Sequence, residues 1–209
     1  MDVIAVLGTG RMGAGLSRSF VRAGREVFVG SRDPARAEEL AAGLRQEHPG
    51  AAVRAGTYAE AAQAGRMVVL PIPYPEAAGV LKLLRPLLER KIVVDITNPF
   101  GAAPEGLSAA EVHAPLLPPS ASLVAAWKTT YFKWLEPEVR AGQLHDVFVC
   151  GEDEWSKREV MDLVRATDFR PLDCGGLESC RVLDAMVPLL FEVARRNGSL
   201  ELFAWKFLP

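Results

Sequence analysis

The sequence contains few of the residues from which metal sites, disulfide frameworks and nucleophilic active sites are built. Its 209 residues include only three cysteines and three histidines. The cysteines form neither a C-x-x-C pair nor a metal-type cluster, and their odd number does not suggest a disulfide framework. The sequence also has no nucleophile elbow and no P-loop motif. These absences predict a protein without a metal site, in which the cysteines stay reduced and behave as small apolar residues.

A charge excess and a long apolar run are also missing. The 24 Lys and Arg residues nearly balance the 26 Asp and Glu residues, leaving a formal net charge of -2. This balance gives no reason to expect nucleic acid or a membrane surface as a partner. No apolar run approaches the ~20 residues that span a bilayer, and no basic leader precedes the first apolar run. We therefore expect a globular protein of the cytoplasm.

A glycine motif directly follows the first apolar run, residues 3–7, and leads into a helical pattern. Gly8 permits a sharp turn, Gly10 lets a pyrophosphate approach the backbone, and Gly13 lets the helix pack closely on the strand. The unpaired N–H groups at the start of that helix attract phosphate. An ordinary structural turn is the alternative, but the flanking strand and helix favour dinucleotide binding. The residues predicted to bind are Gly8, Thr9, Gly10, Arg11, Met12 and Gly13.

The end of the second predicted strand, residues 26–30, indicates which dinucleotide is bound. NAD sites carry an acidic residue there, which hydrogen-bonds the ribose and repels a 2′-phosphate. This chain has Ser31 and Arg32 instead, with Arg36 one helical turn further on. A hydroxyl and two guanidinium groups suit a phosphate, so we predict NADP(H). Asp33 is expected to cap a helix that begins at Pro34; the alternative to phosphate binding is that this cap is the only role of the segment and that the arginines are solvated.

Further apolar runs at residues 67–70, 91–96 and 123–126 predict three more buried strands. Ligands of open parallel sheets lie outside the carboxyl ends of their strands. The segment after the first of these runs is therefore expected to pass beside the cofactor, although Tyr74 suits a helix entry equally well. Residues 101–122 show little periodicity and predict a long loop over the cleft. The cofactor contacts expected at these strand ends are Pro71, Ile72, Pro73, Tyr74, Asn98 and Ala125.

The pattern as a whole predicts an α/β protein with a Rossmann-type, doubly wound parallel sheet and a smaller C-terminal α/β lobe. We place the dinucleotide-binding domain at residues 1–126 and the lobe at residues 127–209. The lobe begins with Trp127-Lys128-Thr129-Thr130-Tyr131-Phe132, whose aromatic rings and cation suit a flat acceptor. Strands at residues 146–150 and 169–172, a helix at 154–166 and a final amphipathic helix follow. Trp205, Phe207 and Leu208 suggest a tail that docks on this chain or on a second subunit.

Over nearly its whole length the sequence resembles the NADP oxidoreductases that use the deazaflavin coenzyme F420. It is also similar to the cytosolic reductase domain of the six-transmembrane metalloreductases. The shared segments include the glycine motif, Val29-Gly30-Ser31-Arg32, Pro71-Ile72-Pro73 and Lys91-Ile92-Val93-Val94-Asp95. The resemblance continues through Cys150-Gly151-Glu152-Asp153 and Arg170-Pro171-Leu172-Asp173 to Arg181.

This resemblance implies NADP(H) on the first domain, a flat tricyclic acceptor closed in by the lobe, and a homodimer formed through the C-terminal helices. The family has His-Thr after the last strand, whereas this chain has Trp127-Lys128-Thr129, so coenzyme F420 and the flavins FMN and FAD stay open as acceptors. We expect Trp127 to cover the acceptor ring. Lys128 or Arg181 is expected to stabilise the negative charge that hydride transfer brings to it. The alternative for both cations is a surface salt bridge.

Two other functions are compatible with the sequence. The chain has no obligatory acid or base, which fits a protein that binds NADPH as a sensor without turnover. A small imine or 2-hydroxy-acid reductase is the other alternative, but its catalytic Lys or His is missing unless Lys128 serves. Hydride transfer to a ring acceptor needs neither, because the cofactor carries the chemistry.

Overall fold

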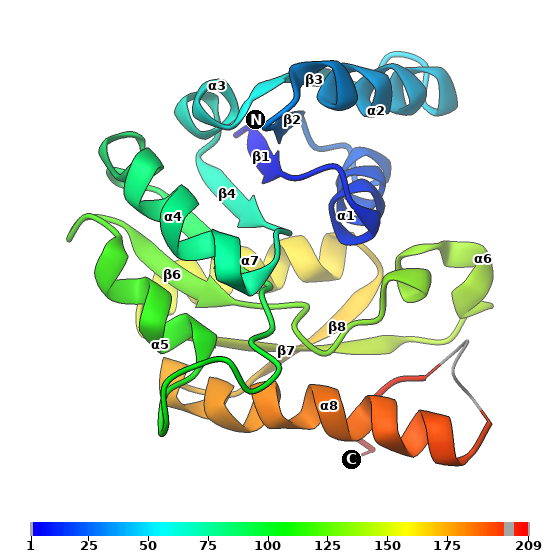
Figure 1. Ribbon diagram of the computed structural model, residues 1–209. Coiled ribbons are helices and arrows are strands. Elements are labelled where there is room, and N and C mark those ends of the chain that lie inside the picture. Colours follow the sequence, from blue (N-terminus) through cyan, green and yellow to red (C-terminus); the bar gives the residue numbers. More distant parts are fainter. Residues whose placement is uncertain (1, 199–202, 209) are drawn as a thin grey trace.

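The computed structural model describes residues 2–198 and 203–208 and shows a sheet with helices on both sides (Figure 1). The strands are β1 (Ile4–Leu7), β2 (Val27–Ser31), β3 (Val53–Thr57), β4 (Met67–Leu70), β5 (Ile92–Asp95), β6 (Ser122–Ala125), β7 (His145–Gly151) and β8 (Phe169–Asp173). The α-helices are α1 (Arg11–Arg22), α2 (Pro34–Glu47), α3 (Tyr58–Ala64), α4 (Tyr74–Leu84), α5 (Ala109–His113), α6 (Pro137–Arg140), α7 (Glu154–Ala166) and α8 (Cys180–Arg196). Short 3-10 turns lie at Arg85–Leu87, Ala114–Leu116, Phe132–Leu135 and Leu177–Ser179.

The eight strands form one sheet in the order β3-β2-β1-β4-β5-β6-β7-β8. Strands β1 to β6 are parallel, and β7 then runs antiparallel to β6 and parallel to β8. This arrangement confirms the Rossmann-type α/β fold. The division at residue 126, which stays a prediction, falls between β6 and β7, where the strand direction reverses within a continuous sheet.

Local signals in the sequence explain where the helices begin. Asp33 caps α2 by accepting from the Ala35 N–H, with Pro34 as the first helical residue. Thr57 and Glu60 form a reciprocal capping box at α3. The central strands β1 and β4 are buried along their whole length, as expected for parallel strands covered on both faces.

The segment at residues 101–122, predicted as a long loop, contains a short helix. A capping box of Ser108 and Glu111 begins α5, and Ala110 of that helix packs in the core. The Ser108 hydroxyl also donates to the Leu177 carbonyl, and the Ala109 N–H donates to Asp184 on α8. The segment is therefore tied to the C-terminal part of the molecule.

The C-terminal tail docks on its own chain. Trp205 Nε1 donates to the Met186 carbonyl of α8 at 3.2 Å, and the Phe207 N–H donates to Asp146 of β7 at 2.6 Å. Trp134 Nε1 donates to the Phe203 carbonyl at 2.6 Å, which places Phe203 beside the segment after β6. Of the two docking sites expected for the tail, this chain or a second subunit, these contacts show the first, on α8 and β7.

Within residues 2–198 and 203–208, no helix combines the length and the apolar character needed to cross a membrane. In the same residues, no group of three or more His, Cys, Asp or Glu side chains is placed to hold a metal ion.

Candidate active site

The glycine turn between β1 and α1 is built by three glycines that do different things. Gly8 has φ +147°, and a Cβ there would lie 3.0 Å from the Pro71 carbonyl oxygen. A Cβ on Gly13 would lie only 2.0 Å from the Gly8 carbonyl oxygen, so only glycine allows this approach of helix to turn. A Cβ on Gly10 would meet nothing within 4 Å. The turn is closed on its inner side and open at Gly10, where a phosphate fits.

No side chain caps the start of α1, because Gly10 holds the N-cap position without a side-chain hydrogen bond. The first N–H groups of α1 are therefore free to bind an anion, and the positive end of the helix dipole favours one. Together with the open space at Gly10, this fits a pyrophosphate.

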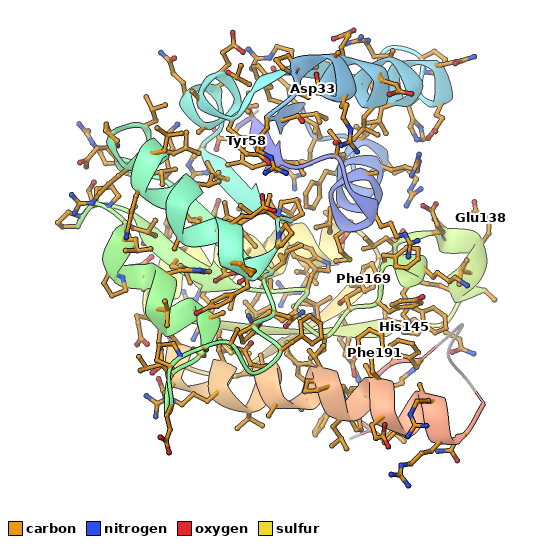
Figure 2. The ribbon with its side chains drawn as sticks, viewed as in Figure 1. Asp33, Tyr58, Glu138, His145, Phe169 and Phe191 are labelled. Carbon is orange, nitrogen blue, oxygen red and sulfur yellow. The ribbon has the colours of Figure 1, made fainter. Side chains whose placement is uncertain are left out.

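A cavity of about 360 Å³, here named the glycine-turn cavity, lies beside this turn at the carboxyl ends of β1, β2 and β4. It brings together nine of the predicted residues and adds Asp33, Tyr58 and Glu76. Figure 2 shows Asp33 and Tyr58 near each other at the α2 and α3 side of the molecule. The residues lining it are Gly8, Thr9, Gly10, Ser31, Arg32, Asp33, Arg36, Tyr58, Pro71, Ile72, Pro73 and Glu76.

One charged residue of this cavity, Glu76, was not predicted from the sequence. Arg32 is largely exposed and forms a 2.7 Å ion pair with Glu76 from the first turn of α4. The buried Ser31 hydroxyl accepts a hydrogen bond from the Asp33 N–H at 3.2 Å. Burial raises the pKa of the Tyr58 hydroxyl, so this group remains a hydrogen-bond donor above neutral pH as well. Sequence spacing gave no signal for Tyr58 or Glu76, because each comes from a different helix.

A second cavity of about 340 Å³, here named the aromatic cavity, lies between the start of α1, the segment after β6, and α8. Three predicted cofactor contacts, Arg11, Met12 and Asn98, line this cavity rather than the glycine-turn cavity, together with the predicted catalytic Lys128. Phe191 lies on the side of α8 that faces the rest of the molecule (Figure 2). The lining residues are Arg11, Met12, Asn98, Phe100, Lys128, Thr129, Thr130, Tyr131, Phe132, Val187, Leu190, Phe191 and Phe203.

The aromatic rings of this cavity pack against one another. Tyr131 stacks on Phe203 with ring centroids 4.5 Å apart and meets Phe132 edge-on at 4.6 Å. Phe191 meets Phe203 at 5.0 Å. The sequence singled out the segment with Tyr131 and Phe132, but not Phe191 or Phe203, whose spacing resembles any apolar helix face or tail. The result is a preformed apolar wall that suits a flat ring.

Consecutive residues of the glycine turn line the two cavities. Gly10 lines the first, while Arg11 and Met12, the next two residues, line the second. The Arg11 guanidinium lies over the Phe132 ring, 4.9 Å from its centroid. This adjacency fits a ligand that extends from Gly10 toward the aromatic cavity.

Trp127 lines neither cavity, contrary to the expectation that it would cover the acceptor ring. Its side chain is 1% exposed and meets Phe20 of α1 edge-on, with ring centroids 5.8 Å apart. Its φ of +50° is rare for a residue with a side chain. The indole fills the core between α1 and β6, so it cannot stack on a ring in the aromatic cavity.

Lys128 is buried and paired rather than turned toward a ligand. Its Nζ lies 2.8 Å from Asp184 on α8 and donates to the Thr97 carbonyl. Burial would lower the pKa of Lys128, but the charges of Asp95 and Asp184 outweigh it and raise that pKa. The lysine is thus a fixed, compensated charge under the aromatic cavity, and the predicted catalytic role is not supported.

Asp95 joins this buried network from the end of β5. Its carboxylate lies 2.8 Å from His113 Nδ1 and accepts from the Thr97 N–H at 2.7 Å. Complete burial would raise the pKa of Asp95, but the Lys128 charge and the His113 hydrogen bond lower it below its usual value. Sequence reasoning missed Asp95, His113 and Asp184, because nothing in their spacing shows that they meet.

Asn98 links the network to the aromatic cavity. Its Nδ2 donates to the Lys128 carbonyl at 2.8 Å, while its buried Oδ1 has no partner among the described residues. The amide that was expected to bond a cofactor therefore holds the backbone of the segment after β6.

The other predicted residues lie outside both cavities. Arg181 lies in the first turn of α8 and is half exposed, and its Nε donates to Glu111 at 2.8 Å; this is the surface salt bridge named as the alternative. The nearest cavity residues of α8 lie about 9 Å further along the helix axis. Tyr74 is the first residue of α4 and packs on His113 at 5.3 Å, the helix-entry position. Ala125 is fully buried in β6, so its side chain faces neither cavity.

The similarity to known proteins extends over this whole arrangement. Residues 3–99 match the family described as NADP oxidoreductase coenzyme F420-dependent. The F420-dependent NADP reductase of Methanocaldococcus jannaschii is 34% identical over 204 residues, covering 90% of each chain. Metalloreductase STEAP3 of Rattus norvegicus is 31% identical over 189 residues, covering 89% of this chain and 36% of that protein.

A solved structure has the same overall fold. The crystal structure described as that of an F420-dependent NADP-reductase from Arthrobacter sp. FB24 has a TM-score of 0.84 with this chain. The two are 27% identical, and the match covers 99% of each. The likeness thus includes β7, β8 and α8 as well as the sheet around the glycine turn.

Proposed function

The chain belongs to the family of coenzyme F420-dependent NADP oxidoreductases, and on that basis we propose that it transfers hydride between NADP(H) and the deazaflavin ring of coenzyme F420. It is an NADP-dependent oxidoreductase; the identity of the acceptor is the proposal. The observation that carries it is that consecutive residues of the glycine turn, Gly10 and Arg11, line the two cavities. NADP(H) lies in the glycine-turn cavity, and the acceptor ring lies in the aromatic cavity.

The polar end of the cofactor is assigned to the glycine-turn cavity. Ser31, Arg32 and Arg36 would hold the 2′-phosphate, because they supply a hydroxyl and two cations where NAD enzymes carry an acid. The pyrophosphate would lie at Gly10, against the free N–H groups of α1. When bound, NADPH supplies the hydride from its dihydronicotinamide ring.

The chain itself contributes orientation and exclusion of water. The rings of Tyr131, Phe132 and Phe191 provide an apolar surface against which a flat acceptor is held. The buried pair of Lys128 and Asp184 fixes the backbone beneath that surface. Placing donor and acceptor in adjoining cavities converts the encounter of two rings into a step within one complex.

The direct experiment is steady-state oxidation of NADPH by the purified protein with coenzyme F420, FMN or FAD, followed by the absorbance of NADPH. We expect coenzyme F420 to give the highest kcat/KM; FMN and FAD are the second candidates, because their rings have a similar flat shape. A faster reaction with a flavin would reassign the acceptor. NADPH binding without oxidation by any of the three rings would favour a sensor, and turnover of an imine or a 2-hydroxy acid instead would favour the third alternative.

The cofactor assignment has its own test. Arg32→Ala is expected to lower the ratio of kcat/KM for NADPH over NADH about 10- to 100-fold, because a hydrogen bond to a charged group is worth about 1.5–3 kcal/mol. Arg54→Ala is the matched control, since Arg54 pairs with Glu26 away from the cavity. An unchanged ratio in Arg32→Ala would place the 2′-phosphate elsewhere.

We also propose that the protein is a homodimer joined through α8. Supporting this, Val182, Leu189 and Val193 of α8 are 64%, 52% and 43% exposed, respectively. Apolar side chains along one helix favour a partner of the same kind. Sedimentation of wild type and Leu189→Glu tests this: the variant is expected to be monomeric, and a wild-type monomer would contradict the proposal.

A further inference from the structure

We infer that Arg11 is a catalytic residue of the aromatic cavity, where its guanidinium contacts the acceptor ring and stabilises the negative charge that the ring gains with the hydride. The inference rests on the proposed function, since it requires a ring acceptor in that cavity. It replaces the roles first expected for Lys128 and Arg181.

The position of Arg11 separates it from the rest of the glycine motif. Gly8, Thr9 and Gly10 line the glycine-turn cavity, whereas Arg11, the first residue of α1, lines the aromatic cavity. Its guanidinium carbon lies 4.9 Å from the centroid of the Phe132 ring. The side chain therefore points toward the acceptor site, although its backbone belongs to the phosphate-binding turn.

Arg11 is also the cation that is free to act. Lys128 is neutralised by Asp184, and Arg181 by Glu111. Within residues 2–198 and 203–208, no carboxylate forms an ion pair with Arg11, and its side chain is exposed. A cation without an acid partner at the edge of an apolar cavity is available to attract a developing anion.

The chemistry of the transfer requires such a charge. One C–H bond breaks on the dihydronicotinamide and one forms on the acceptor ring; both electrons move with the hydrogen. The nicotinamide becomes cationic, and the acceptor gains one negative charge, which spreads to its ring nitrogen and carbonyl oxygen. The Phe132 ring holds the Arg11 guanidinium by a cation–π contact. The N–H groups at the edge of the guanidinium can then donate to the ring nitrogen and carbonyl oxygen of the acceptor.

The test compares Arg11→Gln and Arg11→Lys with wild type. Arg11→Gln is expected to lower kcat/KM for the acceptor about 100-fold, the usual loss when one charge-stabilising donor is removed. Arg11→Lys should restore part of the loss, because it keeps the charge. The dissociation constant of NADPH, measured without acceptor, should change less than about threefold. Arg18→Gln is the control on the same helix, since Arg18 pairs with Glu47.

A binding measurement without turnover also tests whether Arg11 stabilises the reduced ring. Reduced and oxidised coenzyme F420 are titrated separately into each variant, and binding is followed by fluorescence. Arg11→Gln should weaken binding of the reduced, anionic ring at least tenfold more than binding of the oxidised ring. Arg11→Gln removes a cation from the first turn of α1, where a positive charge opposes the helix dipole, and Arg11→Lys leaves the charge unchanged. We therefore expect both variants to fold.

The outcomes separate the inference from the function on which it rests. If wild type reduces the ring and Arg11→Gln does so equally well, the inference fails and the proposed function stands. If Arg11→Gln instead weakens NADPH and leaves both ring affinities unchanged, Arg11 belongs to the phosphate site. If wild type neither binds nor reduces coenzyme F420 or a flavin, the proposed function fails and the inference fails with it.

Discussion

The two cavities differ in how the chain builds them. The glycine-turn cavity uses backbone N–H groups and exposed side chains at the ends of β1, β2 and β4, all within the first 76 residues. The aromatic cavity draws on α1, the segments after β5 and β6, α8 and the C-terminal tail. The first is specified by local backbone conformation, whereas the second depends on packing between distant segments. Substitutions in the two are therefore expected to fail in different ways.

The largest effect is expected in the buried network under the aromatic cavity. Lys128→Met leaves Asp95 and Asp184 without their cation, which typically costs about 3–5 kcal/mol of unfolding free energy. Urea denaturation measures this loss of unfolding free energy. Arg181→Gln, which removes a half-exposed cation from α8, the helix that carries Asp184, is the control and should change little. A Lys128→Met protein as stable as wild type would show that the wall does not depend on this pair.

The same network predicts a pH dependence that the glycine turn does not share. The lowered pKa of Asp95 contributes stability that is complete above its unfolded value of about 4 and is lost as the pH falls through the folded pKa. The raised pKa of Lys128 contributes stability that is complete below about 10 and is lost as the pH rises through the folded value. Unfolding free energy measured from pH 7 to pH 3 should fall less steeply in Asp95→Asn than in wild type. Equal slopes would contradict this assignment.

Two glycines of the turn are expected to respond in opposite ways. Gly13→Ala places a Cβ 2.0 Å from the Gly8 carbonyl oxygen, so backbone must move, at a cost of about 1–3 kcal/mol. Gly10→Ala meets no protein atom within 4 Å, so its stability should match wild type while its affinity for NADPH falls about tenfold or more. Thermal unfolding and NADPH titration of both variants separate folding from binding. Normal NADPH affinity in Gly10→Ala would remove the phosphate from this turn.

A smaller effect is expected at the wall of the aromatic cavity. Phe191→Ala removes one ring of the wall and should raise KM for the acceptor about 3- to 10-fold, in line with an aromatic contact of about 0.5–1.5 kcal/mol. The KM for NADPH should stay unchanged. Trp155→Ala on α7 is the aromatic control, since Trp155 lines neither cavity and lies beside Arg66. A change confined to the KM for NADPH would mean that the two cavities have been assigned the wrong way round.

The smallest effect concerns the ion pair inside the glycine-turn cavity. Glu76→Gln releases Arg32 from a partly exposed pair, which is worth at most about 1 kcal/mol. NADPH should bind about 2- to 5-fold more tightly, and NADH should gain nothing, since it has no 2′-phosphate. Titration of both cofactors measures this. Weaker NADPH binding would mean that Glu76 positions Arg32 for the phosphate instead of competing with it.

The sequence predicted most of what short-range chemistry determines. The strand, turn and helix around Gly8, Gly10 and Gly13 could be read directly, as could Asp33 as the cap of α2. Ser31 and Arg32 were placed correctly at the end of β2 because a parallel strand delivers its last residues to one edge of the sheet. The helix at residues 154–166 was predicted with its observed bounds, Glu154–Ala166.

The remaining features depend on partners far along the chain. A tryptophan after a strand suits a ligand site or a core equally well, and the left-handed backbone of Trp127, which the structure places against Phe20, has no sequence signature. Lys128 resembled a catalytic cation because Asp184, its neutralising partner, lies on a distant helix. Composition likewise described residues 101–122 as a loop, although Ser108 and Glu111 have the spacing of a capping box; the contacts to α8 further stabilise the short helix there.

The docking of Phe203 beside Trp134 has a consequence for the order of folding. Residues from the beginning and the end of the chain must meet before the aromatic cavity exists, and such contacts cost the most loop-closure entropy. The glycine-turn cavity closes shorter loops. During refolding the glycine-turn cavity is thus expected to form before the aromatic cavity. The chain should therefore be able to bind NADPH before it can bind the acceptor.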